Sequence, residues 1–243
     1  MDLFVKGFRF TVRNVFKGIN FVLVPLSRWT KYVQLRVTRH YLPLFDETRA
    51  FRLYDTKRRL EVIKNKVKEL NKPCSVLDIG ANNGYFMRKL AVEGHFCIGI
   101  EADDCYIQLG RFMIDYRKLK GIALVDQRIS ADNVGSLPAC DVVLFMSVFQ
   151  KITKQAGIEN AKEVLKGIWK STGSYLFFEM PDVLESEEQF IKDLPATGKT
   201  KEECNQSLEK FLKELLSPRS IEMIDEYDME YRDEKRTLFL LKK

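Results

Sequence analysis

One segment, residues 75–101, constrains the fold of this chain more than any other. A short run of leucine and β-branched residues, Ser75–Ile79, contains the acid Asp78 and is followed by a glycine-bracketed turn and a helix-like stretch. A second apolar run, Cys97–Ile100, then ends at Glu101. This pattern predicts a strand, a tight loop, a helix and a second strand. Ligands of open α/β sheets lie beyond the carboxyl ends of the strands, so Glu101 is placed to accept hydrogen bonds from ribose hydroxyls. The segment therefore predicts a site for a nucleoside-containing cofactor.

The residues of this loop favour one kind of nucleoside cofactor over another. Gly80 and Gly84 allow a sharp turn and a close approach of the backbone to a ligand. Asn82 stands where a positive φ is expected, which asparagine tolerates better than most residues. The nicotinamide fingerprint G-x-G-x-x-G is incomplete, because its second and third glycines are absent. Asp78 would repel a diphosphate and attract a cationic amino group.

The same residues resemble the first motif of the class I S-adenosylmethionine (SAM)-dependent methyltransferases, V-L-D-x-G-x-x-x-G, and in that family an acid also ends the second strand. The resemblance covers about residues 70–243. It implies an α/β fold with a Rossmann-like, seven-stranded, mostly parallel sheet and an antiparallel C-terminal strand. It also implies SAM as the cofactor and methyl transfer as the activity.

Four further stretches resemble this family. The turn and apolar run 137–144 is similar to an "L-P-x-x-D-V-V-L" stretch that opens the fourth strand of such enzymes. Residues 173–181 fit the fifth strand and its exit. Residues 220–227 and 235–242 fit a terminal antiparallel pair.

The resemblance also implies which positions hold the cofactor. Around the first two strands these positions are Asp78, Gly80, Ala81, Asn82, Gly84, Phe86, Glu101 and Ala102. We expect the adenine near the end of the third strand, at Asp126, Gln127 and Ile129, with Asp132 as an alternative. Met146, at the end of the fourth strand, is a further expected cofactor position. Upstream of the first strand, candidates for binding the methionine carboxylate are Arg49, Arg52 and Tyr54.

The residues that would perform the chemistry are less well defined. A hydroxyl acceptor needs a general base, and Glu179, at the exit of the fifth strand, is the best-placed carboxylate. The run 147–152 resembles the "S-V-F-H-H-I" run of some glycan-modifying and RNA-end-capping members, with Gln150 and Lys151 in place of the histidines. We take Glu179, Gln150 and Lys151 as the catalytic candidates. His95 precedes the second strand, at the wrong end of the sheet, whereas His40 could cover the site from the N-terminal region.

Charge divides the chain into two parts. Residues 1–72 contain 17 Lys and Arg against 6 Asp and Glu, a net charge of +11, whereas the remainder contains 23 against 28, a net charge of −5. We therefore expect a basic, amphipathic, helical N-terminal extension (residues 1–45) and a SAM-dependent methyltransferase domain (residues 46–243). The extension has aromatic residues at helical spacing, beginning with Phe4 and Phe8, and lysines and arginines on another face.

The extension has three interpretations. It docks on the domain or on a second subunit, it binds a membrane surface through residues 1–24, or it binds nucleic acid, which the negative charge of the domain makes less favourable. Its apolar run ends at Pro25 and is too short to span a membrane. Five cysteines without a C-x-x-C pair suggest neither a disulfide framework nor a metal site. We expect a cytoplasmic protein, with peripheral attachment to the inner face of a membrane as an open alternative.

Three functions follow from these observations. The first is an active methyltransferase acting on a hydroxyl of a saccharide, a lipid-linked compound or a small molecule. The second is an RNA methyltransferase. The third is a SAM-binding scaffold without catalytic activity. The sequence identifies neither the acceptor nor the oligomeric state.

Overall fold

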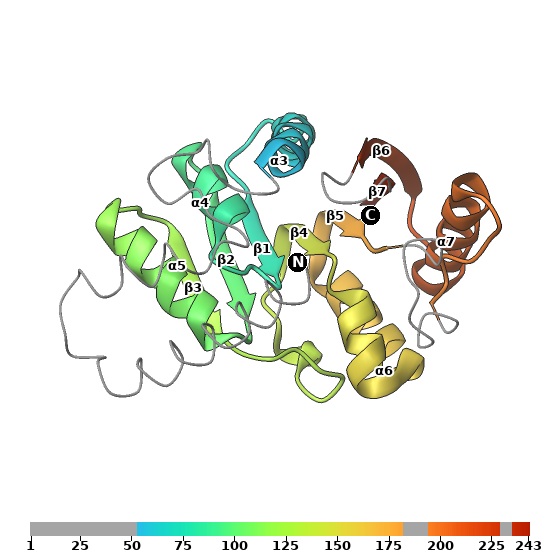
Figure 1. Cartoon of the computed structure of the whole chain (residues 1–243). Helices are drawn as coiled ribbons and strands as arrows, with labels where there is room; N and C mark the ends of the chain where they lie inside the picture. Colours follow the sequence, from blue (N-terminus) through green and yellow to red (C-terminus); the bar gives the residue numbers. More distant parts are fainter. Residues whose placement is uncertain (1–52, 182–193, 229–234) are drawn as a thin grey trace, which may run out of the picture.

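The computed structural model describes residues 53–181, 194–228 and 235–243 (Figure 1). The predicted N-terminal extension, residues 1–45, lies outside these residues, and so does the predicted start of the domain at residue 46. In the part of the chain that is described, no helix is long and apolar enough to cross a membrane.

Seven strands form one sheet in the order β3-β2-β1-β4-β5-β7-β6. Their bounds are β1 Ser75–Ile79, β2 Phe96–Glu101, β3 Ile122–Asp126, β4 Cys140–Met146, β5 Thr172–Glu179, β6 Ser220–Asp228 and β7 Lys235–Lys242. Strands β1 to β5 are parallel, and β7 runs antiparallel between β5 and β6. The predicted α/β, Rossmann-like fold with seven mostly parallel strands and an antiparallel C-terminal strand is confirmed.

Helices cover both faces of the sheet (Figure 1). Apolar residues of α3 (Leu53–Lys68), α4 (Tyr85–Val92) and α5 (Asp104–Tyr116) form one buried cluster with alternate residues of the strands. On the opposite face, α6 (Phe149–Ser171), α7 (Lys201–Leu216) and the short 3-10 helix η1 (Val134–Ser136) form a second cluster. The two clusters arise because successive strand residues point to opposite faces.

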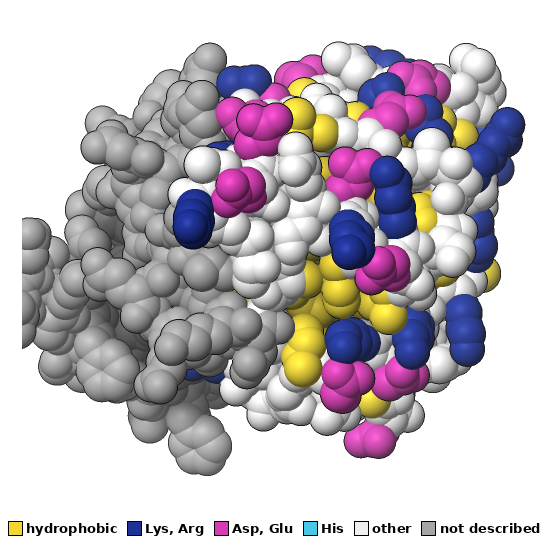
Figure 2. Space-filling model, turned by 90° about the vertical axis from the view of Figure 1, so that its right-hand side faces the viewer, with side chains coloured by type: hydrophobic (Ala, Val, Ile, Leu, Met, Phe, Trp, Pro, Cys, Tyr) yellow, Lys and Arg dark blue, Asp and Glu magenta, His cyan; other side chains and the backbone are white. Residues whose placement is uncertain are grey.

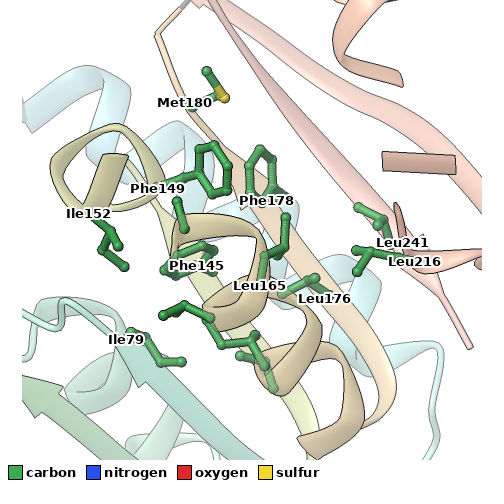
Figure 3. Close-up of a cluster of buried hydrophobic side chains, with 14 of the residues drawn as sticks. Ile79, Phe145, Phe149, Ile152, Leu165, Leu176, Phe178, Met180, Leu216 and Leu241 are labelled. Atoms are coloured by element: carbon green, nitrogen blue, oxygen red, sulfur yellow. The ribbon is translucent and has the colours of Figure 1, made fainter. Parts of the chain in front are cut away.

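The second cluster is rich in aromatic rings near the carboxyl ends of β4 and β5. Figure 3 shows Phe145, Phe149 and Phe178 together, each fully buried. The Phe178 ring lies 5.9 Å from both of the others, between centroids. This packing fixes the start of α6 against the two strands that end at the predicted site.

The side of the molecule that bears α7 and β6 has a mixed-charge surface. In Figure 2, side chains of both signs alternate over it around a hydrophobic patch. Ion pairs along α7, such as Lys213 with Glu209 and Lys210 with Glu214, contribute to this alternation. Such a surface differs from the single-sign stripe that a nucleic-acid-binding face presents.

The strand order reverses between β1 and β4, which are hydrogen-bonded neighbours. Crossover connections leave from these two strands in opposite directions, and a crevice at such a switch point is the usual ligand site of open α/β sheets. The glycine loop after β1, the end of β2 and the link from β4 to α6 all lie at this edge.

Gly99 in β2 is fixed by close packing, which yields a first prediction. A Cβ at this position would lie 2.2 Å from Met87 Sδ on α4 and 2.8 Å from Ala81 Cβ in the loop. We expect Gly99→Ala to lower the free energy of unfolding by about 1–3 kcal/mol through overpacking. Gly135→Ala, where a Cβ meets nothing within 4 Å, is the matched control, and urea denaturation measures both. Equal stability of the two variants would contradict the packing argument.

Candidate functional site

The loop that joins β1 to α4 has the conformation that its residues favour. Gly80, Asn82 and Gly84 all have positive φ, at 76°, 54° and 73°. The expectation for Asn82 is therefore confirmed. The N–H groups of Gly80 and Ala81 both donate to the Ile100 carbonyl, at 2.8 and 3.0 Å, and tie the loop to the end of β2. The loop thus has a fixed position between two strand ends.

Gly80 also permits a close approach from the neighbouring strand. A Cβ at this residue would lie 2.4 Å from Cγ2 of Val148, which links β4 to α6. A side chain at Gly80 would therefore close the switch point. The sequence alone explains the turn at Gly80 but not this contact, which depends on β4 lying next to β1.

Glu101 connects the two loops at the carboxyl ends of β1 and β2. One of its carboxylate oxygens accepts from the Asn82 N–H at 2.8 Å. The other accepts from the N–H groups of Ala102 and Asp103, at 2.8 and 2.9 Å. A carboxylate has about four lone-pair sites, so these three bonds orient the group and leave capacity for a further donor.

Asp78 is buried beneath the same loop, and its side chain is 4% exposed. Its Oδ2 has no hydrogen-bond partner within the described structure. Burial, together with the negative charge of Glu101, raises the pKa of the Asp78 carboxyl to about 7. A buried carboxylate without a counter-charge is unfavourable, so this position suits a ligand that brings a cation.

The end of β3 completes one side of the site. Asp126 pairs in register with Glu101, and the Gln127 N–H donates to the Glu101 carbonyl at 3.0 Å. The Asp126 side chain is exposed and that of Gln127 is half-buried. Ile129, by contrast, packs into the core on the α6 face, so only the first two side chains lie near the predicted cofactor positions.

A second buried acid, Glu179, lies at the end of β5 and is fully enclosed. Its Oε2 accepts from Arg59 Nη1 of α3 at 3.0 Å and from the Tyr227 hydroxyl of β6. Its Oε1 accepts from the Ser147 hydroxyl, just after β4, and from Arg236 Nη1 of β7 at 3.4 Å. We call these five residues the Glu179 cluster.

The Glu179 cluster determines the protonation state of its central acid. Burial favours the neutral form, but the two guanidiniums and the two hydroxyl donors outweigh it and lower the pKa of Glu179 to about 2. The same burial and the Glu179 charge raise the pKa of Tyr227. An enclosed carboxylate that is this acidic and has four donors is poorly suited to remove a proton from an acceptor. These contacts argue against the predicted role of Glu179 as a general base.

The other catalytic candidates lie in the first turn of α6. Gln150 is half-buried, and its Oε1 has no hydrogen-bond partner among the described atoms. Lys151 is exposed. Met146 ends β4, half-buried and opposite Glu179 in the β4–β5 register. Gln150 and Lys151 therefore follow the strand end as predicted, but no contact assigns either of them a role.

Some predicted residues lie away from this edge or outside the description. His95 precedes β2 and accepts a hydrogen bond at Nδ1 from the Cys74 N–H at 3.1 Å, which agrees with its expected structural role. Arg49, Arg52 and His40 are outside the described residues. Tyr54 lies in the first turn of α3, where only the backbone is described.

Arg59 and Arg236 are not among the predicted site residues, because those predictions rest on polar residues that follow strands. A different signal identifies them. Arg59 is spaced by four and eight residues from Ile63 and Val67, which are fully buried on α3, so it continues an apolar helix face. Arg236 alternates in the same way with Leu238 and Leu240 on β7. A charged residue on a buried face indicates a buried partner.

Comparison with known proteins adds information on the fold alone. No family model and no curated protein sequence matches this chain. A crystal structure of WbdD, described as a bifunctional kinase-methyltransferase, superposes with a TM-score of 0.67 at 21% identity over 87% of this chain. The superposition covers 45% of the WbdD chain, so this protein spans less than half the length of that neighbour.

A second solved structure resembles the chain over nearly its whole length. Magnesium protoporphyrin IX methyltransferase (ChlM) from Synechocystis PCC 6803 with bound SAM has a TM-score of 0.56 at 11% identity, covering 94% of this chain and 97% of that one. Together with the strand order, these similarities show that the protein has the fold of the class I SAM-dependent methyltransferases.

The uncompensated charge of Asp78 gives a prediction on stability. The folded-state pKa of about 7 exceeds the ordinary aspartate value of 3.8, so the ligand-free protein loses stability as pH rises between these values, by on the order of 1.4 kcal/mol per pH unit. We expect Asp78→Asn to gain stability relative to wild type by about 2–3 kcal/mol more at pH 8 than at pH 5. Urea denaturation at both pH values tests this, and a pH-independent difference would contradict it.

The pKa of Glu179 is shifted in the opposite direction to that of Asp78, so its effect on stability has the opposite dependence on pH. Its folded pKa of about 2 lies below the ordinary glutamate value of 4.5, so its contribution to stability is present above pH 4.5 and is lost as pH falls through about 2. Glu179→Gln removes the buried negative charge that the guanidiniums of Arg59 and Arg236 share and should lower the free energy of unfolding by about 3–5 kcal/mol. Glu222→Gln is the control, because Glu222 pairs with Lys66 and Lys242 at the surface and should contribute about 1 kcal/mol at most. Equal losses in the two variants would contradict the assignment.

Proposed function

We propose that this protein is a SAM-dependent methyltransferase whose donor site is the switch-point edge formed by the β1–α4 loop and the end of β2. The observation that carries the proposal is the Asp78 carboxyl, buried and with one oxygen unpartnered directly beneath the glycine loop. A buried acid in this state suits a ligand with an ammonium group, and the methionine end of SAM has one.

The start of α4 suits the other charge of that amino acid. Its N-cap is Gly84, no side chain caps the first turn, and no acidic residue occupies it. The free N–H groups of a helix N-terminus favour an anion such as a carboxylate. Asp78 and the start of α4 lie at the two ends of one short loop. The ammonium group of a single amino acid would therefore suit Asp78, and its carboxylate would suit the helix start.

Two features support a nucleoside at the other end of the donor. Glu101 is oriented by three backbone N–H groups and keeps acceptor capacity for ribose hydroxyls. Asp126 and Gln127 at the end of β3 are proposed to lie beside the adenine, and Ile129 is left with at most a backbone role. The donor supplies the methyl group on a sulfonium sulfur, which makes it a strong alkylating agent.

The contribution of the protein is therefore mainly alignment. Asp78 and Glu101 hold the donor at two points along its length, and the glycines let the backbone lie against it. Fixing both reactants can lower the barrier by about 7–11 kcal/mol. We propose that Glu179 supports the site as the centre of a buried ion-pair cluster and does not transfer a proton, and that Gln150 and Lys151 face the acceptor side from the start of α6.

For the acceptor we propose a hydroxyl of a saccharide, lipid-linked or small-molecule compound. The S-V-F run at 147–149 supports this choice, and one structural neighbour is a methyltransferase of a small molecule, magnesium protoporphyrin IX. The mixed-charge face over α7 and β6 disfavours RNA there (Figure 2). We further propose a cytoplasmic location, because the five cysteines are odd in number and include no C-x-x-C pair, which does not suggest a disulfide framework.

Calorimetric titration tests the donor site directly. We expect SAM and S-adenosylhomocysteine to bind the wild-type protein, and Asp78→Asn and Glu101→Gln each to lower the affinity about tenfold or more, since each loses a charge-assisted contact worth about 1.5–3 kcal/mol. Glu209→Gln, on α7 where Glu209 pairs with Lys213 at the surface, is the control. Absence of binding by the wild-type protein would overturn the proposal.

Activity requires a second measurement. The full-length protein is incubated with methyl-labelled SAM and a cell extract, which is then separated into lipid, glycan, small-molecule, RNA and protein fractions. Label in the first three supports the proposed acceptor class, and label in RNA contradicts it. Binding without transfer to any fraction would instead indicate a SAM-binding scaffold.

A further inference from the structure

Arg59 contacts two parts of the molecule that the proposed function treats separately. It belongs to α3 and is 7% exposed. Its Nη1 donates to Glu179, at the end of β5, and its Nη2 donates to Thr56 Oγ1 at 3.4 Å. These bonds fix the plane of the guanidinium on the acceptor side of the switch point, where β4 and β5 end.

Two aromatic rings lie within cation–π distance of the same guanidinium. Arg59 Cζ is 5.0 Å from the centroid of Tyr227, itself a donor to Glu179, and 5.6 Å from that of Phe86. Phe86 is the second residue of α4, two positions after Gly84, so it lies in the helical turn that directly follows the glycine loop. A cation within about 6 Å of a ring centroid is attracted to it, most strongly where water is excluded.

We propose that Arg59 is a positioning residue that holds the first turn of α4, and with it the glycine loop, in register with the ends of β4 and β5. It acts through Phe86 on one side and Glu179 on the other, without contact to the donor. The proposal rests on the glycine loop being the donor site. It implies that donor affinity depends on a side chain of α3, which the sequence motifs of the donor site do not include.

A purely structural role predicts a different pattern of effects. Such a role would make Arg59 important for the stability of the protein and leave the donor affinity of the folded molecules unchanged. The neighbouring Arg58 provides the comparison, because it also joins α3 to β6, through Asp225 at 2.6 Å, but its side chain is 44% exposed. Among the described residues, neither Phe86 nor Tyr227 forms a cation–π contact with Arg58. Arg58→Met therefore controls for the loss of a basic residue from the same helix.

The test measures the affinity for S-adenosylhomocysteine by calorimetry in Arg59→Met, Phe86→Leu, the double variant and Arg58→Met. Thermal unfolding of each variant confirms that the protein is folded at the temperature of the titration. We expect Arg59→Met to weaken binding about tenfold, equivalent to about 1.4 kcal/mol, and Arg58→Met to leave it unchanged. Because Arg59 acts through Phe86, the double variant should bind no more weakly than the weaker single variant.

Arg59→Lys keeps the test informative if Arg59→Met does not fold. Lysine retains a charge for Glu179 but not the planar guanidinium that lies within cation–π distance of both rings. We expect this variant to remain folded and still to bind S-adenosylhomocysteine more weakly than wild type. Wild-type affinity in folded Arg59→Met or Arg59→Lys, or additive losses in the double variant, would overturn the positioning role. Absence of binding by the wild-type protein would instead overturn the proposed function.

Discussion

The arrangement of this protein depends most on the hydrogen bonds and ion pairs of the Glu179 carboxylate. It is fully buried, and its donors come from α3, from the residue after β4, and from β6 and β7. Taking one carboxylate and two guanidiniums out of water is costly, and four hydrogen-bond donors around one acid offset that cost only when each element is in place. The cluster therefore specifies how the C-terminal strands and α3 meet the parallel part of the sheet.

The two buried acids of the site are opposites. Glu179 has the counter-charges of Arg59 and Arg236 and is ionised. Asp78 forms no ion pair among the described residues, and burial raises its pKa to about 7. One acid contributes to stability and the other reduces it. A destabilising, unpartnered acid beside a glycine loop is the kind of conflict that functional sites retain, and this contrast is the strongest reason to assign ligand binding to Asp78 and support to Glu179.

Local patterns were sufficient to predict much of this structure from the sequence. The apolar runs around Asp78 and Glu101, the glycines and the turn at Asn82 are local features. They correctly gave the loop and the positive φ of Asn82, and the family resemblance that rests on them correctly gave the sheet class. The Glu179 cluster was not predictable in the same way. Arg59 and Glu179 are 120 residues apart, and nothing in the sequence around either one specifies the other. Glu179 was therefore interpreted as an isolated acid at a strand exit, and its low pKa, which depends on partners from other elements, was not foreseen.

The position of β7 has a consequence for how the chain acquires its structure. Among the described strands, β6 is hydrogen-bonded to β7 alone, which follows it in the sequence. Tyr227 and Arg236 therefore reach Glu179 only after residues 235–242 have inserted beside β5. Until then β1 to β5 can pair with one another, but their central acid lacks two of its donors. The Glu179 cluster is therefore completed only when the last strand of the chain has joined the sheet.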